Sequence, residues 1–167
     1  MKDANGLLVR AAGLAAQGRT EESEQCLAHL CGLHPTHARA HFALGQQRSV
    51  LGRWPGAAEA YSQAEEHELD HGHLMVVVKA KGVAWLRGGM AGAALEEFVR
   101  VCEATPGDGE AWALRSRALE MLGRGAEADE ALDKAEALGS ESLKRMIQAS
   151  KQRERNKTAG EPKPVDY

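Results

Sequence analysis

The residues of this chain that could ligate a metal ion are its seven histidines and three cysteines. One candidate set is close in sequence but is scattered by the predicted helices and turns, whereas a tetrahedral site needs ligands that converge on one point: Cys26, His29, His34, His37 and His41. A second set consists of His67, Asp70, His71 and His73, in which His67 and His71 are four residues apart and could share one face of a helix. No complete ligand pattern surrounds them, so we expect surface or capping histidines and no bound metal.

The residues that could act in acid-base or nucleophilic catalysis are explained equally well by helix structure. Acidic residues cluster near the start of several predicted helices, where negative charge interacts favourably with the helix dipole; they are Glu21, Glu22, Glu96, Glu97, Glu127, Asp129 and Glu130. The glycine-rich segment 87–92 has neither a preceding strand nor the Lys-Ser/Thr pair of a phosphate-binding loop. We therefore expect no catalytic residues, no cofactor and no enzymatic activity.

The composition narrows the partners and the compartment. A net charge of -3 gives no chain-wide positive excess, so we do not expect nucleic acid as a partner. No window reaches the roughly 18 consecutive apolar residues of a membrane span, and residues 1–18 contain Asp3 and lack the apolar stretch of a signal peptide. The three cysteines are an odd set without disulfide or zinc spacing. We expect reduced thiols, no membrane association and a cytoplasmic location.

The elements that position these residues follow a repeat of about 34 residues. Four units align, at 4–37, 38–71, 75–108 and 109–140, with an extra Gly72-His73-Leu74 before the third. Small residues recur at the eighth position of the units (Ala11, Gly45, Gly82 and Ser116), and bulky residues recur at the twenty-fourth (Leu27, Tyr61, Phe98 and Leu132). Two antiparallel helices approach closely where a small residue of one faces a large residue of the other, so each unit predicts a helix pair.

Glycines mark the turn inside each pair, at Gly18, Gly52, Gly89 and Gly123, because glycine accepts the left-handed backbone that ends a helix. We expect helices over 4–17, 20–33, 38–51, 55–69, 73–87, 91–104, 109–122 and 125–138. A ninth helix over 141–157 would cap the last pair, followed by a disordered tail over 158–167. The prediction is thus one domain over 1–157.

These units resemble the tetratricopeptide repeat (TPR), whose signature has the same small and bulky positions. The resemblance implies an all-α, right-handed superhelical solenoid of antiparallel helix pairs, about nine helices in all. The chain departs from the pattern at the usual proline position, where Pro35 and Pro106 are present but Leu69 and Ser140 replace the other two. Arg48 and Arg115 also occupy positions that the family usually fills with apolar side chains.

The resemblance implies that the first helix of each pair lines a concave groove. The positions that face this groove predict a partner-binding set of Leu8, Ala12, Arg39, Phe42, Gln46, Val76, Lys79, Val83, Leu86, Arg87 and Arg117. Chaperone-binding members of the family grip C-terminal carboxylates with Lys, Arg and Asn, but the corresponding positions here hold apolar residues such as Leu8 and Val76. An apolar floor with isolated cations suits an extended or helical peptide; packing between helices is the alternative role for each residue.

Two further segments suggest contacts outside the groove. The run Leu74 to Val78 is apolar on every side of a helix start, so part of it needs cover from the inserted residues or from a partner. The predicted ninth helix carries six cations, Lys144, Arg145, Lys151, Arg153, Arg155 and Lys157, against Glu141 and Glu154. It is either a solvated capping helix or a contact for RNA or an acidic protein.

The sequence therefore predicts a non-enzymatic protein-binding module. The leading hypothesis is an adaptor or chaperone that binds a peptide segment of a partner protein in the concave groove. One alternative is a self-associating assembly scaffold that uses Val76 to Val78 or an end of the stack. Another is a bacterial secretion chaperone, because the chain is similar in length and groove to the translocator chaperones of type III systems, and its Leu30-Cys31-Gly32-Leu33-His34 segment resembles theirs.

Overall fold

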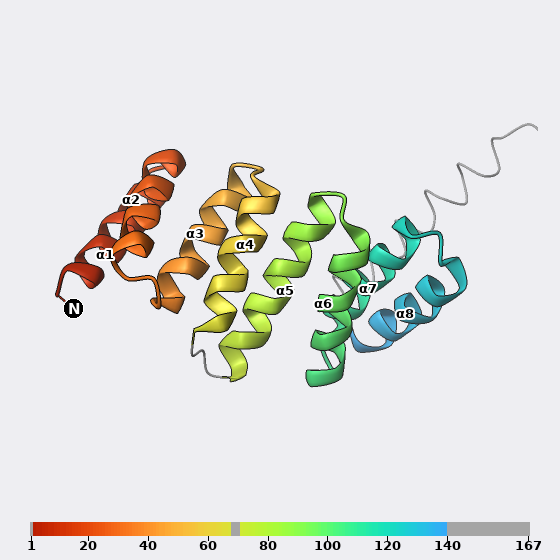
Figure 1. Ribbon diagram of the computed structural model, residues 1–167. Helices are drawn as coiled ribbons and strands as arrows, with labels where there is room; N and C mark the ends of the chain where they lie inside the picture. Colours follow the sequence, from red (N-terminus) through yellow and green to blue (C-terminus); the bar gives the residue numbers. More distant parts are fainter. Residues whose placement is uncertain (1, 68–70, 140–167) are drawn as a thin grey trace, which may run out of the picture.

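The computed structural model describes residues 2–67 and 71–139, and these residues form helices and short turns without a strand. The eight helices are α1 (Lys2–Ala16), α2 (Thr20–Leu33), α3 (Ala38–Val50), α4 (Trp54–Glu66), α5 (His71–Arg87), α6 (Ala91–Ala104), α7 (Gly109–Met121) and α8 (Gly125–Leu138). Each helix packs against the next one in the chain, so α1 to α8 form four antiparallel pairs that stack in a row (Figure 1). The predicted all-α architecture of stacked helix pairs is confirmed.

Close packing within a pair depends on a small residue facing an aromatic ring, as the repeat predicts. A Cβ atom on Gly45 of α3 would lie 2.6 Å from the Tyr61 ring of α4, and one on Gly82 of α5 would lie 2.7 Å from the Phe98 ring of α6. Real side chains do not approach so closely, so these two positions accept only glycine at the present helix spacing. Tyr61 and Phe98 are themselves buried.

The turn inside each pair also has the predicted geometry. Gly18, Gly52, Gly89 and Gly123 have φ values of 74°, 69°, 81° and 72°, and no other residue in the described ranges has a positive φ. This left-handed conformation costs a residue with a Cβ atom about 1 kcal/mol or more, which explains glycine at the same place in each repeat.

The extra residues before the third repeat lengthen a helix, which corrects one prediction. Helix α4 ends at Glu66 rather than at residue 69, and α5 begins at His71 rather than at residue 73. Three added residues are close to one helical turn, so Gly72-His73-Leu74 extends the start of α5. His67 and His71 therefore do not belong to one helix, and the prediction that they share one helical face is wrong.

The apolar run at the start of α5 is covered mainly by the neighbouring helices. Val77 is buried against Ala57, Tyr61 and other residues of α4, and Val78 is buried against Val101 of α6 and Ala111 of α7. Val76 alone of the three valines is accessible, at 50% exposure. Most of the run is therefore core, with the inserted Leu74 packed against the cluster that contains Val78, and Val76 is the valine that stays accessible.

The two arginines that depart from the repeat pattern pair with groups close to them in the stack. Arg48 of α3 donates from Nε to Glu24 of α2 (3.2 Å) and from Nη1 to the carbonyl of Gly56 (2.9 Å). Arg115 of α7 lies over the Trp112 ring, 5.0 Å from its centroid. Each long side chain thus has a charged or aromatic neighbour at a position where the family has an apolar contact.

No helix within the described ranges is long and apolar enough to cross a lipid bilayer. The predicted ninth helix, its cationic face and the predicted tail at 158–167 lie outside the described residues.

Candidate functional site

The residues predicted to bind a partner all lie on the first helices of the pairs. The most accessible of them are Ala12 on α1, Arg39 and Gln46 on α3, Val76 and Arg87 on α5, and Arg117 on α7. Leu8, Phe42, Lys79, Val83 and Leu86 are partly buried. The structure brings some of them together in two hollows and assigns others to packing or ion pairs.

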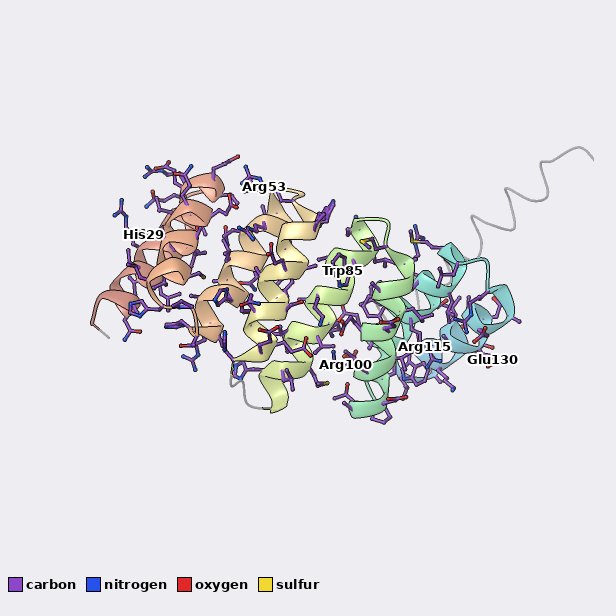
Figure 2. The ribbon with its side chains drawn as sticks, viewed as in Figure 1. His29, Arg53, Trp85, Arg100, Arg115 and Glu130 are labelled. Carbon is purple, nitrogen blue, oxygen red and sulfur yellow. The ribbon has the colours of Figure 1, made fainter. Side chains whose placement is uncertain are left out.

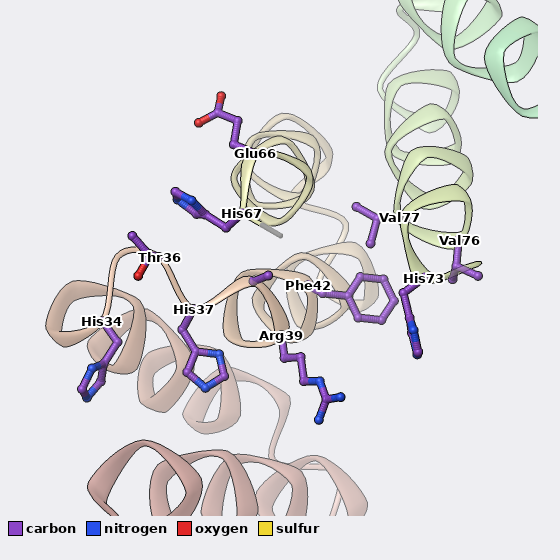
Figure 3. A pocket seen from close by; sticks show the side chains of 11 residues that line it. His34, Thr36, His37, Arg39, Phe42, Glu66, His67, His73, Val76 and Val77 are labelled. Carbon is purple, nitrogen blue, oxygen red and sulfur yellow. The ribbon is translucent and has the colours of Figure 1, made fainter. Parts of the chain in front are cut away.

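The larger hollow, here called the α3–α5 hollow, has a volume of about 740 Å³. It lies between the start of α3, the end of α4 and the start of α5, and its lining includes Phe42, Val76 and Val77. Phe42 projects from α3 toward α5 (Figure 3), and its ring centroid lies 5.7 Å from that of Tyr61. This contact holds the Phe42 ring in place, so one wall of the hollow is a fixed apolar surface.

The smaller hollow, here called the α1–α3 hollow, has a volume of about 540 Å³. Its floor is apolar and comes from Leu8, Ala12 and Ala15 of α1 together with Ala43 of α3 and Leu27 of α2. The amides of Gln46 and Gln47 stand at its α3 side. The small alanine side chains leave space between α1 and α3, and a side chain of a bound ligand could fill that space.

Arg39 lines both hollows and connects them. Its side chain is exposed, and no carboxylate among the described residues forms an ion pair with it. Glu66, the acidic residue in the lining of the α3–α5 hollow, points away from Arg39 (Figure 3). The Arg39 guanidinium is therefore available to a ligand.

Lys79 was predicted to line the rim of the groove, but it is held by an ion pair between repeats. Its Nζ donates to Asp108 Oδ2 (3.0 Å) and to Glu110 Oε2 (2.8 Å), which lie at the start of α7. Burial lowers the pKa of Lys79, but the hydrogen bonds to Glu110 and Asp108 outweigh burial, and its pKa is raised. The ammonium is thus charged and already neutralised, which leaves it little attraction for a partner's carboxylate.

Val83, Leu86, Arg87 and Arg117 line neither hollow. Val83 and Leu86 pack against the buried cluster of Ala94, Phe98 and Ala118, so they mainly join α5 to α6 and α7. The candidate site therefore lies on α1, α3 and α5, which are the first helices of the first three pairs.

The histidines in the α3–α5 hollow were missed as site residues. His34, His37, His67 and His73 line it, although they come from three different segments of the chain. His37 caps α3 by accepting a hydrogen bond from the Ala40 amide at Nδ1 (3.3 Å), which is the predicted capping role. No group of three or more His, Cys, Asp or Glu within 2–67 and 71–139 is placed to hold a metal ion.

A second charged cluster joins the second repeat to the third. Lys81 of α5 is buried and contacts Glu65 of α4 (2.5 Å) and Glu97 of α6 (2.8 Å). Arg100, labelled in Figure 2, contacts the same two carboxylates at 2.5 and 2.7 Å. Burial raises the pKa of Glu65, but the hydrogen bonds from Lys81 and Arg100 outweigh it, so the pKa is lowered and the carboxylate stays ionised. Such a fully paired cluster is a structural joint rather than an acid-base pair.

Two of the three cysteines do not add reactive groups to the site. Cys31 and Cys102 are buried free thiols, and burial raises the pKa of each to about 11. Because the thiolate is the nucleophilic form, these two residues are unreactive near neutral pH.

Comparison with known proteins supports the fold assignment. No family model matches the chain, and no curated protein sequence matches it significantly. Among solved structures, MamA from Desulfovibrio magneticus RS-1, residue 41 to its end, is similar with a TM-score of 0.79 at 17% identity over 95% of this chain and 89% of that one. A MamA RS-1 double mutant is similar with a TM-score of 0.75 at 20% identity, over 83% of this chain and 76% of that one. A further MamA crystal structure has a TM-score of 0.72 at 19% identity, over 98% and 79% of the two chains.

At these identities the similarity concerns the fold alone. It agrees with the repeat pattern, the four glycine turns and the small-to-large contacts within the pairs. The described helices form four helix pairs with the tetratricopeptide-repeat fold, similar to that of MamA.

Proposed function

We propose that this chain is a non-enzymatic adaptor or chaperone that binds a peptide segment of a partner protein across α1, α3 and α5. The observation that carries the proposal is the pair of hollows on either side of α3, which share Arg39. In addition to Arg39, the hollows contain five of the predicted binding residues: Leu8, Ala12, Phe42, Gln46 and Val76. Neighbouring hollows along a row of helices suit a ligand that is long and narrow.

The chemistry of the hollows supports a peptide better than a small metabolite. Apolar floors accept hydrophobic side chains, and the Gln46 and Gln47 amides can hydrogen-bond to a peptide backbone. Both hollows are lined by first helices and share Arg39, so a bound chain can continue from one into the other. We also propose that the protein is cytoplasmic and that it binds this segment while the partner protein is unfolded or the segment is extended.

Self-association is less well supported as the main function. It was predicted to use Val76 to Val78 or an end of the stack, and Val77 and Val78 are core residues of the described chain. A role as a secretion chaperone is one form of the proposed binding function and would use the same hollows.

The test is capture of partner proteins by the purified chain and by variants that fill each hollow. Ala12→Arg would block the α1–α3 hollow, and Val76→Glu would place a charge in the α3–α5 hollow; both side chains are accessible, so the fold should be retained. Ala28→Arg on α2 and Val50→Glu at the end of α3 introduce the same groups outside the hollows.

We expect the wild type and the two control variants to capture the same proteins, and the two blocking variants to lose them. Far-UV circular dichroism would verify equal helix content in all five proteins. If Ala12→Arg and Val76→Glu capture the same proteins as the wild type, the proposed binding face is wrong.

A further inference from the structure

The position of Arg39 on α3 restricts the kind of peptide that the two hollows can accept. Three of the accessible arginines have a carboxylate of their own: Arg19 pairs with Glu22, Arg100 with Glu65, and Arg124 with Glu127. Four other exposed arginines, Arg10, Arg39, Arg87 and Arg117, form no ion pair within the described residues, and of these four only Arg39 lines the hollows. Arg39 has no such partner in the described part of the chain, although it stands between two cavities. An unneutralised guanidinium at that place attracts an anionic group on the ligand.

Among the described residues, no carboxylate is placed to cancel the charge of Arg39. Glu66 projects from the end of α4 away from the guanidinium, while His37 lies beside Arg39 and His73 lies across the hollow (Figure 3). The next carboxylates along the first helices, Asp108 and Glu110, are occupied by Lys79. The electrostatic preference of this region is therefore for negative charge at one place, over α3.

Apolar surface lies on both sides of that place. On one side are Phe42 and Val76, and on the other are Leu8 and Ala12. A helix with its side chains is about 10–12 Å across, and an extended chain advances about 3.3 Å per residue. An extended peptide that crosses α3 therefore reaches both hollows with side chains about three or four residues apart.

We infer that the partner segment is an extended peptide in which one Asp or Glu lies between two apolar residues, the carboxylate pairing with Arg39 and the apolar side chains entering the two hollows. This inference rests on the proposed function and adds the chemistry of the partner. A guanidinium binds a carboxylate through two parallel hydrogen bonds, which fixes the position of the acidic residue. The carboxylate belongs to an internal side chain, because no lysine or second arginine of the described residues stands in the hollows to hold a free C-terminus.

The experiment is selection of a displayed library of random dodecapeptides on the immobilised full chain. The same library is selected on Arg39→Glu and on the matched control Arg117→Glu, an exposed arginine of α7 that lines neither hollow. Glutamate near the start of α3 is compatible with the helix dipole, so Arg39→Glu should remain folded, as circular dichroism would verify.

We expect the wild type and Arg117→Glu to enrich peptides with an acidic residue between apolar residues, and Arg39→Glu to enrich a basic residue there. An enriched peptide should bind Arg39→Gln about tenfold or more weakly than it binds the wild type. Enriched peptides that lack the acidic residue, or the same motif on Arg39→Glu, would overturn this inference and leave the proposed function standing. No enrichment on any of the three proteins would overturn the proposed function as well.

Discussion

At the scale of single residues, glycine and phenylalanine set the distance between the helices of a pair. Gly82 has a backbone conformation that any residue can adopt, yet a Cβ atom there would meet three Phe98 ring atoms at 2.7 to 3.1 Å. Phe98 is completely buried, so its ring cannot swing aside into solvent. Glycine is therefore needed at position 82 because of the neighbouring Phe98 ring and not because of the backbone conformation.

Gly82→Ala should therefore destabilise the protein by about 1–3 kcal/mol, the usual cost of overpacking a core. Gly13→Ala is the matched control, because Gly13 lies inside α1 and a Cβ atom there would meet no atom within 4 Å. Alanine at that position should stabilise the protein by about 0.5–1 kcal/mol through helix propensity alone. Urea unfolding followed by far-UV circular dichroism measures both changes, and equal effects of the two substitutions would contradict this explanation of Gly82.

At the scale of helices, ion pairs connect each helix pair to the next. Glu24 with Arg48 and Arg53 joins the first two repeats, and Lys81 with Glu65 joins the second to the third. Lys79 with Asp108 and Glu110 joins the third to the fourth. These charged contacts lie at the same junctions as buried apolar contacts, such as those of Val77 in the cluster with Tyr61 and of Val78 in the cluster with Ala111.

Lowering the pH should weaken these ion pairs between repeats. The pKa of Glu65 is lowered from 4.5 and that of Asp108 from 3.8, in each case because hydrogen bonds outweigh burial. A carboxyl group with a lowered pKa binds protons more readily in the unfolded chain, so its contribution to stability is present above its ordinary pKa and is lost as the pH falls toward its folded pKa. The free energy of unfolding should therefore decrease as the pH is lowered from about 6 to about 3.

Urea unfolding across that pH range, repeated for Glu65→Gln, tests the assignment. Glu65→Gln should flatten the decrease, because the amide cannot titrate. Glu22→Gln is the control: the pKa of Glu22 is also lowered by its hydrogen bond with Arg19, but the pair is exposed and solvent screens it. The assignment fails if Glu22→Gln flattens the pH dependence as much as Glu65→Gln does.

At the scale of the whole molecule, stability should vary along the row of helices. Repeat proteins gain stability mainly from contacts with adjacent units. Helix α1 packs mainly against α2, whereas α5 packs against α4, α6 and α7. The first helix is thus supported on one side and the central helix on several.

Native-state hydrogen exchange should show this gradient. We expect backbone amides in the middle of α1 to exchange faster than those in the middle of α5, because α1 can open without disrupting the remaining repeats. Mass spectrometry of proteolytic fragments resolves the two helices. Uniform protection along the chain would indicate that the array opens only as one unit, which would contradict the prediction.

The gradient also bears on the binding face, because the α1–α3 hollow takes one wall from α1. A peptide that fills both hollows would join α1 to α3 and α5. Binding should then reduce exchange in α1 more than in α7, which contributes to neither hollow.

The sequence by itself determined the helix pairs, their turns and the face that carries the candidate site. These features depend on periodicity along one chain segment, so Gly52, Gly89 and the contact between Gly82 and Phe98 could be predicted from spacing. Helix ends differed most from the expectation beside the extra residues before the third repeat, which lengthen α5.

Only the tertiary structure decided which of the predicted site residues are available. Lys79 meets Asp108 and Glu110 from the next repeat, Val77 and Val78 are buried by α4, α6 and α7, and four histidines from separate segments meet in one hollow. These contacts depend on the angle and spacing at which successive helix pairs stack. A repeat pattern predicts which face of a helix a residue lies on, but it does not predict which side chain of the next pair that residue contacts. Arg39 remained without a carboxylate among the described residues for the same reason, and its place between the two hollows is what distinguishes it as the candidate contact for a partner.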